Sequence, residues 1–143
     1  MKIEQLSVFI ENRAGRLANI AANLGEIDID IKAISLADTS EFGILRLVVS
    51  EPQKAKKVLR DRGFTVSLTE VVAIKIADRP GELGKLLQLI EQNSLNIEYV
   101  YGLTENNKDH AILIFSFDDL DRAVEVLQAS HVSLISTREL MDA

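Results

Sequence analysis

An internal repeat constrains the fold of this chain more than any other feature of its sequence. The segment "NRAGRL" at residues 12–17 returns as "DRPGEL" at residues 78–83, so that Gly81 follows Gly15 by 66 positions. The same shift superposes the apolar pattern of residues 8–36 on that of residues 74–102 without a gap. Farther along, the shift becomes 68, and residues 45–49 match residues 113–117. A chain of 143 residues that repeats at about half its length indicates a tandem duplication of one folding unit.

Each copy begins with the pattern of a strand followed by a helix. Apolar and polar residues alternate over residues 6–10 and again over 72–76, which is typical of a strand. After the glycine turn, apolar residues recur at i, i+3, i+4 and i+7 from Leu17 and from Leu83. This spacing predicts an amphipathic helix that ends at Gly25 in the first copy and near Asn93 in the second.

Two more strands, a second helix and a final strand complete each copy. We expect second strands at 29–37 and 96–104, third strands at 43–49 and 111–117, and final strands at 64–68 and 132–134. Ser50 and Gln53 predict a capping box for a helix that ends at Gly63, and Asp118 is the expected cap in the second copy. The order βαββαβ is the ferredoxin-like α+β unit, with an antiparallel sheet and helices on one face. We expect it twice, as domains 1–69 and 70–143.

Composition narrows the classes of function. The formal net charge of −6 and the pI near 4.9 disfavour nucleic acid and anionic membranes as partners. The chain has no cysteine, which excludes disulfides and thiolate metal sites, and we expect no metal and no cofactor. It also has neither an apolar run of about 18 residues nor a signal-peptide pattern at its start, so we expect a cytoplasmic protein.

The third strands are apolar on both faces. Leu45 and Leu47 share one face, yet Ile44 and Val48 are apolar on the other, and residues 111–117 repeat this pattern. An antiparallel sheet with helices on one side normally has a polar second face. We therefore expect that this second face is covered, and a homodimer that packs sheet against sheet is the preferred account.

The two glycine turns have two physical interpretations. Each ends a strand and begins a helix. A glycine turn with Asn12 or Asp78 as the helix cap therefore explains every residue by a structural role alone. Alternatively, a helix N-terminus presents unpaired N–H groups and the positive end of the helix dipole to an anion such as a carboxylate. The residue types alone leave both interpretations open.

The combination of these features resembles a known family. A strand, the motif [DN]-R-x-G-x-L, a helix, and Asp or Asn just before an isoleucine, all within βαββαβ, look like the ACT domain. Both halves match, although Ala14 stands where that family usually has proline. The chain as a whole is similar to the small stand-alone proteins made of two ACT domains. This resemblance implies a regulatory module that binds a small ligand, most often an amino acid, between two units lying side by side.

The resemblance also implies which residues contact the ligand, from a turn of one unit and the second strand of its neighbour. An Asn12–Asn96 site suits a zwitterion, because amides both donate and accept hydrogen bonds. The alternative pair, Asp78 and Asp30, brings together two carboxylates that repel each other unless a cation lies between them. The implied residues are Asn12, Arg13, Ala14, Gly15, Arg16, Leu17, Asp30 and Ile31, together with Asp78, Arg79, Pro80, Gly81, Glu82, Leu83, Asn96 and Ile97.

Other classes of function find less support in the residues. We expect no enzyme, because the chain offers no thiol, no paired Ser/His/Asp arrangement and no phosphate loop, and we expect His110 and His131 to be solvated turn residues. A non-catalytic structural or docking subunit of an amino-acid enzyme, with no ligand of its own, is the alternative. A partner enzyme is compatible with either interpretation, and its identity is unknown.

Overall fold

The computed structural model describes residues 1–11, 13–38, 41–103 and 109–143, with the side chain of residue 38 left out. These residues form seven strands and five helices, grouped into two compact units. The first-repeat unit contains residues 4–69, and the second-repeat unit contains residues 70–143 together with the first three residues of the chain. The division into domains 1–69 and 70–143 itself stays a prediction.

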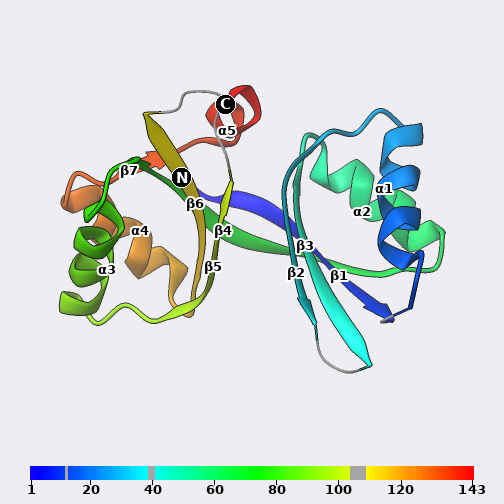
Figure 1. Ribbon diagram of the computed structural model, residues 1–143, viewed down its shortest axis with the longest axis horizontal. Helices are drawn as coiled ribbons and strands as arrows, with labels where there is room; N and C mark the ends of the chain where they lie inside the picture. Colours follow the sequence, from blue (N-terminus) through cyan, green and yellow to red (C-terminus); the bar gives the residue numbers. More distant parts are fainter. Residues whose placement is uncertain (12, 39–40, 104–108) are drawn as a thin grey trace. The chain divides into compact units, whose positions relative to one another are not determined.

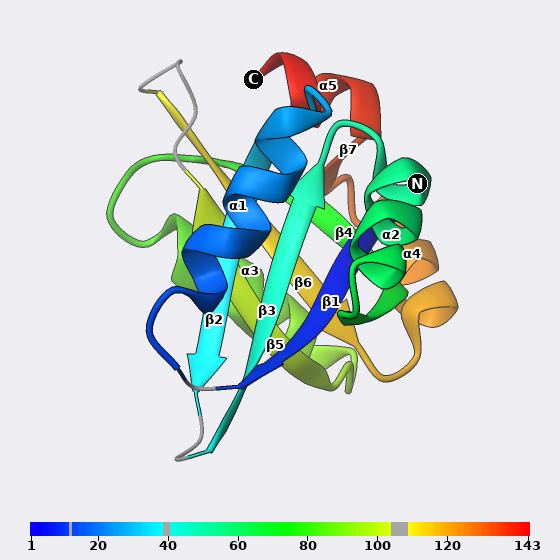
Figure 2. The same ribbon diagram turned by 90° about the vertical axis from the view of Figure 1, so that its right-hand side faces the viewer.

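The first-repeat unit is a βαββαβ unit. Its elements are β1 (Ile3–Glu11), α1 (Arg16–Glu26), β2 (Ile31–Asp38), β3 (Phe42–Val49), α2 (Pro52–Asp61) and the beginning of β4 (Thr65–Ala77). The strands lie in the order β2-β3-β1-β4, and β3 pairs antiparallel with both β1 and β2. Both helices lie on one face of this sheet (Figures 1 and 2).

The second-repeat unit repeats this topology and adds one helix. Its elements are the rest of β4, α3 (Glu82–Gln92), β5 (Ile97–Leu103), β6 (His110–Phe117), α4 (Leu120–Ala129), β7 (Ser133–Ile135) and α5 (Thr137–Asp142). The strand order is β5-β6-β4-β7, and α3 and α4 cover one face of the sheet (Figure 1). Each repeat therefore has the predicted ferredoxin-like α+β fold.

A separate apolar core lies between helices and sheet in each unit. Leu59 of α2 and Leu127 of α4 occupy equivalent positions in the repeat, and both side chains are fully buried. The helical spacing predicted the buried residues Ile20 and Leu24 of α1 correctly. Leu17, at the start of the same predicted stripe, stays 36% exposed, because it lies at the helix end nearest the glycine turn.

Three predicted helix boundaries were wrong. Helix α1 continues through Gly25 to Glu26. Ser50 does not cap α2, because its hydroxyl accepts a hydrogen bond from the N–H of Asp30, 3.0 Å away. In the second copy the cap is Asp119, whose Oδ1 accepts from the N–H of Arg122 at 3.2 Å, and not Asp118. Each boundary is misplaced by only one or two positions. At the two helix starts, neighbouring polar residues compete for the same backbone amides.

The prediction also missed two features of the strands and helices. The final strand of the first copy and the first strand of the second form one uninterrupted strand, β4, of 13 residues. Helix α5 was not predicted, although Ser136 and Glu139 carry the Ser-x-x-Glu pattern of a capping box. In the structure the Ser136 hydroxyl accepts a hydrogen bond from the N–H of Glu139 at 3.2 Å.

The sheet faces that point away from the helices are unequally covered. In the first-repeat unit, Phe9 and Phe42 lie on this face and are 52% and 55% exposed. In the second-repeat unit, Ile112 and Ile114 are buried, with at most 1% exposure. The apolar residues Ile112 and Ile114 of this face are therefore already covered, whereas Phe9 and Phe42 in the first-repeat unit are about half exposed. Among the described helices, none is long and apolar enough to cross a membrane.

Candidate functional site

The two glycine turns have the same backbone geometry. Gly15 and Gly81 take the cap position of α1 and α3 with φ of 89° and 92°, in the left-handed region. The N–H of Arg16 donates to the carbonyl oxygen of Arg13, and that of Glu82 donates to the equivalent oxygen of Arg79, at 3.3 and 3.2 Å. Glycine is required here because its missing Cβ makes positive φ inexpensive.

Among the residues that the structure describes, neither helix has a side-chain cap at this end. The cap residue is glycine in both cases, so it offers no oxygen to the first-turn N–H groups, and Asp78 does not cap α3. A Cβ placed on either glycine would meet no heavy atom within 4 Å, which means that the space beside each turn is open. The amides of the first helical turn are therefore accessible to an anion.

The glycine turn of the first repeat is positively charged. Arg13 Nε lies 2.8 Å from Glu11 Oε2, while Arg16 lies 3.8 Å from the other oxygen of the same carboxylate. Two arginines against one glutamate leave a net positive charge, and α1 has no acidic residue in its first turn. This charge adds to the positive end of the helix dipole.

The second turn is electrically balanced. Glu82 takes the position of Arg16 and lies in the first turn of α3. Its carboxylate is 3.9 Å from Arg79 and 3.5 Å from Lys85. The formal charges of Asp78 and Glu82 cancel those of Arg79 and Lys85. The two glycine turns therefore have the same backbone geometry and differ in charge.

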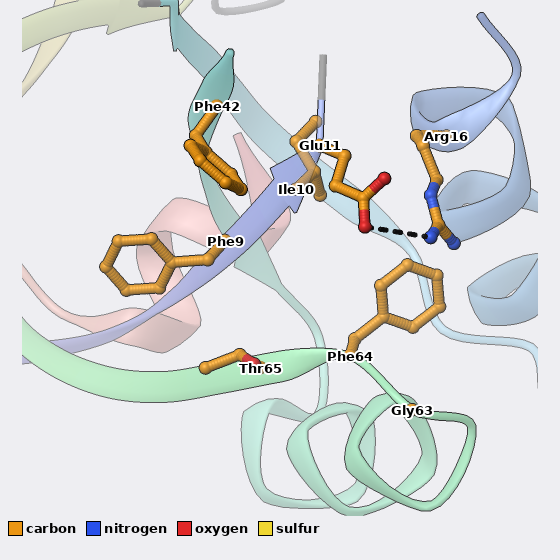
Figure 3. A pocket seen from close by; sticks show the side chains of 8 residues that line it. All are labelled: Phe9, Ile10, Glu11, Arg16, Phe42, Gly63, Phe64 and Thr65. Atoms are coloured by element: carbon orange, nitrogen blue, oxygen red, sulfur yellow. Dashed lines mark ion pairs between the residues drawn. The ribbon is translucent and has the colours of Figure 1, made fainter. Parts of the chain in front are cut away.

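A pocket of about 200 Å³ lies beside the first turn, inside the first-repeat unit (Figure 3). Three aromatic side chains come from separate segments: Phe9 from β1, Phe42 from the start of β3 and Phe64 from the residue before β4. The guanidinium of Arg16 lies over the ring of Phe64, 5.9 Å from its centroid. Glu11 points toward Arg16, as Figure 3 shows. The pocket thus combines aromatic walls with one ion pair.

The second-repeat unit has a hollow at the equivalent place, with a different lining. It includes Lys75, Glu82, His131, Val132 and Ser133. Under the shifts of 66 and 68, Lys75 corresponds to Phe9, Glu82 to Arg16 and Val132 to Phe64. None of these replacements is aromatic, so the repeat has kept the position of the hollow and changed its chemistry.

The predicted second-strand residues lie beside an irregularity that also occurs twice. The register of β2 against β3 shifts between Ile31 and Ala33, and that of β5 against β6 shifts between Ile97 and Tyr99. Asp30 and Asn96, which precede these shifts, are both exposed. Bulges of this kind re-aim side chains and are frequent near functional sites.

The structure does not bring a turn and a second-strand start together within one unit. The 11 residues of α1 separate the turn from the segment that leads to Asp30, a length of about 16 Å. Figure 2 shows α1 running along β2 between these two ends. Any site that combines them needs a turn from a different unit. Asn12 lies outside the described residues.

Sequence reasoning named Arg16 and missed the aromatic residues of its pocket. Phe9 and Phe42 share the sheet face opposite the helices, where Glu11 pairs with Phe42 in the register of β1 and β3. A signal was present in the sequence, because Phe9 is apolar at a position where the strand alternation of residues 6–10 calls for a polar residue. The expectation for His110 was also wrong: it is the first residue of β6, paired with Ala77. His131 is exposed and takes φ of 61° at the position of Gly63.

Comparisons with known proteins agree with this fold. A family model described as an ACT domain pair matches residues 1–143. A crystal structure of a protein from Bacteroides thetaiotaomicron is 36% identical, with a TM-score of 0.92 over 98% of this chain and 96% of that one. No curated protein matches the chain.

More distant structures share the fold alone. The regulatory subunit of aspartate kinase from Thermus thermophilus, in its ligand-free form, is 16% identical with a TM-score of 0.63, covering 88% of this chain and 91% of that one. The same subunit from Thermus flavus is 17% identical with a TM-score of 0.61, covering 90% and 92%.

Proposed function

Because the chain belongs to the family of ACT domain pairs, we propose that it is a regulatory protein that binds a small molecule, an amino acid, through its glycine turns. Domains of this family are regulatory and not catalytic. In this proposal the chain is not an enzyme, and its output passes through another protein. The observation that carries the proposal is the pair of uncapped turns at Gly15 and Gly81, each beside open space.

The ligand lies between two units in this proposal. One side is a turn, residues 12–17 or 78–83, and the other is a second-strand start, Asp30-Ile31 or Asn96-Ile97. The repeated bulges after Asp30 and Asn96 support it, since a bulge conserved between two diverged copies is a built feature of each. We favour the Asn12–Asn96 combination, because the first turn carries the net positive charge that attracts a carboxylate.

The proposal includes a homodimer. Phe9 and Phe42, which are 52% and 55% exposed, lie on the open face of the sheet in the first-repeat unit, and a second copy packed on that face would remove them from water. Sedimentation analysis of the full chain tests this point, and a monomer at micromolar concentration contradicts it. We place the protein in the cytoplasm, with no nucleic acid and no membrane as partner, in keeping with its net charge of −6.

The same exposed side chains favour the alternative function. A non-catalytic docking subunit of an amino-acid enzyme would use this apolar surface for its partner and would need no ligand. The two functions differ in what they require from the glycine turns, because only ligand binding uses the first-turn amides.

A thermal-shift screen of the full chain against the twenty amino acids separates these functions. A ligand that binds only the folded protein stabilises it, by about 2.7 kcal/mol when the ligand concentration is a hundred times Kd. This stabilisation raises the melting temperature. A shift specific to one or a few amino acids supports the sensor. No shift with any of them supports the docking subunit.

Calorimetry then locates the site. We expect the Asn12→Ala, Asn96→Ala double variant to lose binding of the amino acid identified in the screen, because each amide would hold one end of the zwitterion. Asn23→Ala is the control, since the Asn23 side chain contacts Asn19 on the same helix and Arg62, the residue after α2. Unchanged affinity in the double variant contradicts the Asn12–Asn96 site. An Asp30→Ala, Asp78→Ala double variant reports separately on the second combination.

A further inference from the structure

The pocket beside the first turn has a more specific chemistry than the turn alone. We propose that this pocket, lined by Phe9, Phe42, Phe64 and Arg16 inside the first-repeat unit, binds a small carboxylic acid with an apolar or aromatic body. The inference rests on the proposed function in one respect, since it takes the first turn as a ligand-binding element. It differs in naming the chemical class of the ligand and in placing the ligand within one unit.

Arg16 provides the recognition of the carboxylate. Its guanidinium lies 3.8 Å from Glu11, which is longer than a hydrogen bond, whereas Arg13 holds the same carboxylate at 2.8 Å. Arg16 is therefore the weaker partner of Glu11 and keeps donors for a second anion. A guanidinium binds a carboxylate through two parallel hydrogen bonds. The first turn of α1, which lacks an acidic residue, adds to the attraction.

The phenylalanines provide the recognition of an apolar body. Phe9 is 52% exposed and Phe42 is 55% exposed, and both line the pocket. They lie on adjacent strands, β1 and β3, and share one face of the sheet. Phe64 closes the other side of the pocket under Arg16 (Figure 3). A volume of about 200 Å³ is small against the roughly 300–1,000 Å³ of drug-sized sites, so the ligand is small.

The second repeat supplies an internal comparison. At the equivalent hollow, Lys75 replaces Phe9 and Glu82 replaces Arg16. A carboxylate ligand would meet the carboxylate of Glu82 there, and an apolar body would meet an ammonium group. The binding chemistry is thus confined to the first repeat, and the second hollow has lost it.

Two sources of ligand share this chemistry, amino acids and 2-oxo acids. Glu11 gives the amino acids a partner for their ammonium group, whereas a 2-oxo acid relies on Arg16 alone. The probes are L-phenylalanine, L-leucine, phenylpyruvate, L-serine and phenethylamine, each titrated into the full chain by calorimetry. We expect saturable binding of the first two or of phenylpyruvate, at least tenfold weaker binding of serine, and none of phenethylamine, which lacks the carboxylate.

Two variants and two matched controls locate the ligand. Arg16→Gln should weaken binding at least about tenfold, because a charged hydrogen-bond donor is lost. Phe42→Ala should weaken the aromatic probes more than serine. Arg62→Gln removes an arginine of similar exposure and one ion pair in the same unit, and Ile34→Ala removes an apolar side chain that does not line the pocket. Both controls should bind within twofold of wild type, and circular dichroism verifies that all four variants fold.

The outcomes separate this inference from the proposed function. If an amino acid binds and both Arg16→Gln and Phe42→Ala retain its affinity within twofold, the pocket is wrong and the sensor stands. If serine binds as tightly as phenylalanine, the ligand class is wrong. If none of these probes and none of the twenty amino acids binds, both proposals fail. Loss of binding in the two pocket variants, with both controls unaffected, supports the pocket.

Discussion

The guanidinium of Arg16 lies over the ring of Phe64, 5.9 Å from its centroid. This contact joins the first turn of α1 to the segment that leads into β4, two parts of the chain nearly fifty residues apart in sequence. It also defines one wall of the pocket in the first-repeat unit. The second repeat has Glu82 and Val132 at these positions and cannot form the same contact.

Arg16→Gln should reduce the stability of the protein as well as ligand binding. A cation over an aromatic ring at a partly exposed site contributes about 0.5–1 kcal/mol, and Arg16 is 34% exposed. Arg13→Gln is the control, since the Arg13 side chain is 65% exposed and its described contact is the ion pair with Glu11. This variant should cost less than about 0.5 kcal/mol. Urea unfolding measures the free energy of unfolding of both variants, and an equal decrease in the two would show that the ring contact contributes nothing.

Alanine at either turn glycine should be destabilising. Gly15 and Gly81 have φ of 89° and 92°, and an L-residue in the left-handed region costs roughly 1–2 kcal/mol. Gly25→Ala and Gly84→Ala are matched controls, because both lie inside helices and a Cβ there meets nothing within 4 Å. These controls should stabilise the protein by about 0.5–1 kcal/mol. Thermal melts measure these changes, and a melting temperature that shifts in the same direction in all four variants would contradict the turn geometry.

The second helix of each repeat carries a cation that binds the end of the first helix. Arg122 of α4 donates to the carbonyl oxygens of Asn93 and Ser94, at 2.6 and 3.3 Å. At the equivalent position, Lys54 of α2 donates to the oxygen of Ile27 at 3.5 Å. Arg122→Ala should cost about 1 kcal/mol and Lys54→Ala less than half of that, because its single contact is longer. Chemical denaturation tests the order, and a larger loss for Lys54→Ala would contradict it.

Stability should also respond to pH through Lys2. The hydrogen bond from Lys2 to the Asp121 carboxylate raises the pKa of the Lys2 ammonium above its usual 10.5, against a smaller opposing effect of desolvation. A raised pKa in the folded state means that this contribution is complete below pH 10.5 and disappears as the pH rises through the folded-state value. The melting-temperature difference between wild type and Lys2→Gln should therefore be constant from pH 7 to 9 and shrink only above about 10.5. A difference that already shrinks below pH 9 would rule out this origin.

The apolar periodicity predicted most of the fold. The alternation in residues 6–10 and 72–76 and the helical spacing after Leu17 and Leu83 correspond to β1, β4, α1 and α3. Such patterns are local, and one face of each element must be buried whatever its neighbours are. Helix caps were predicted less well, because Asp118 and Asp119 differ by a single position and only the folded backbone decides which one reaches the amide of Arg122.

The candidate site divides in the same way. The sequence by itself determined that the glycine turn occurs twice, one complete βαββαβ unit apart, and that Arg16 is exchanged for Glu82 between the copies. Those are properties of the residues and their spacing. Only the tertiary structure decided that Phe9, Phe42 and Phe64 meet beside Arg16, because their proximity depends on how β1, β3 and the start of β4 lie next to one another in the sheet. No pattern within a single element carries that information, since the contacts form between segments distant along the chain.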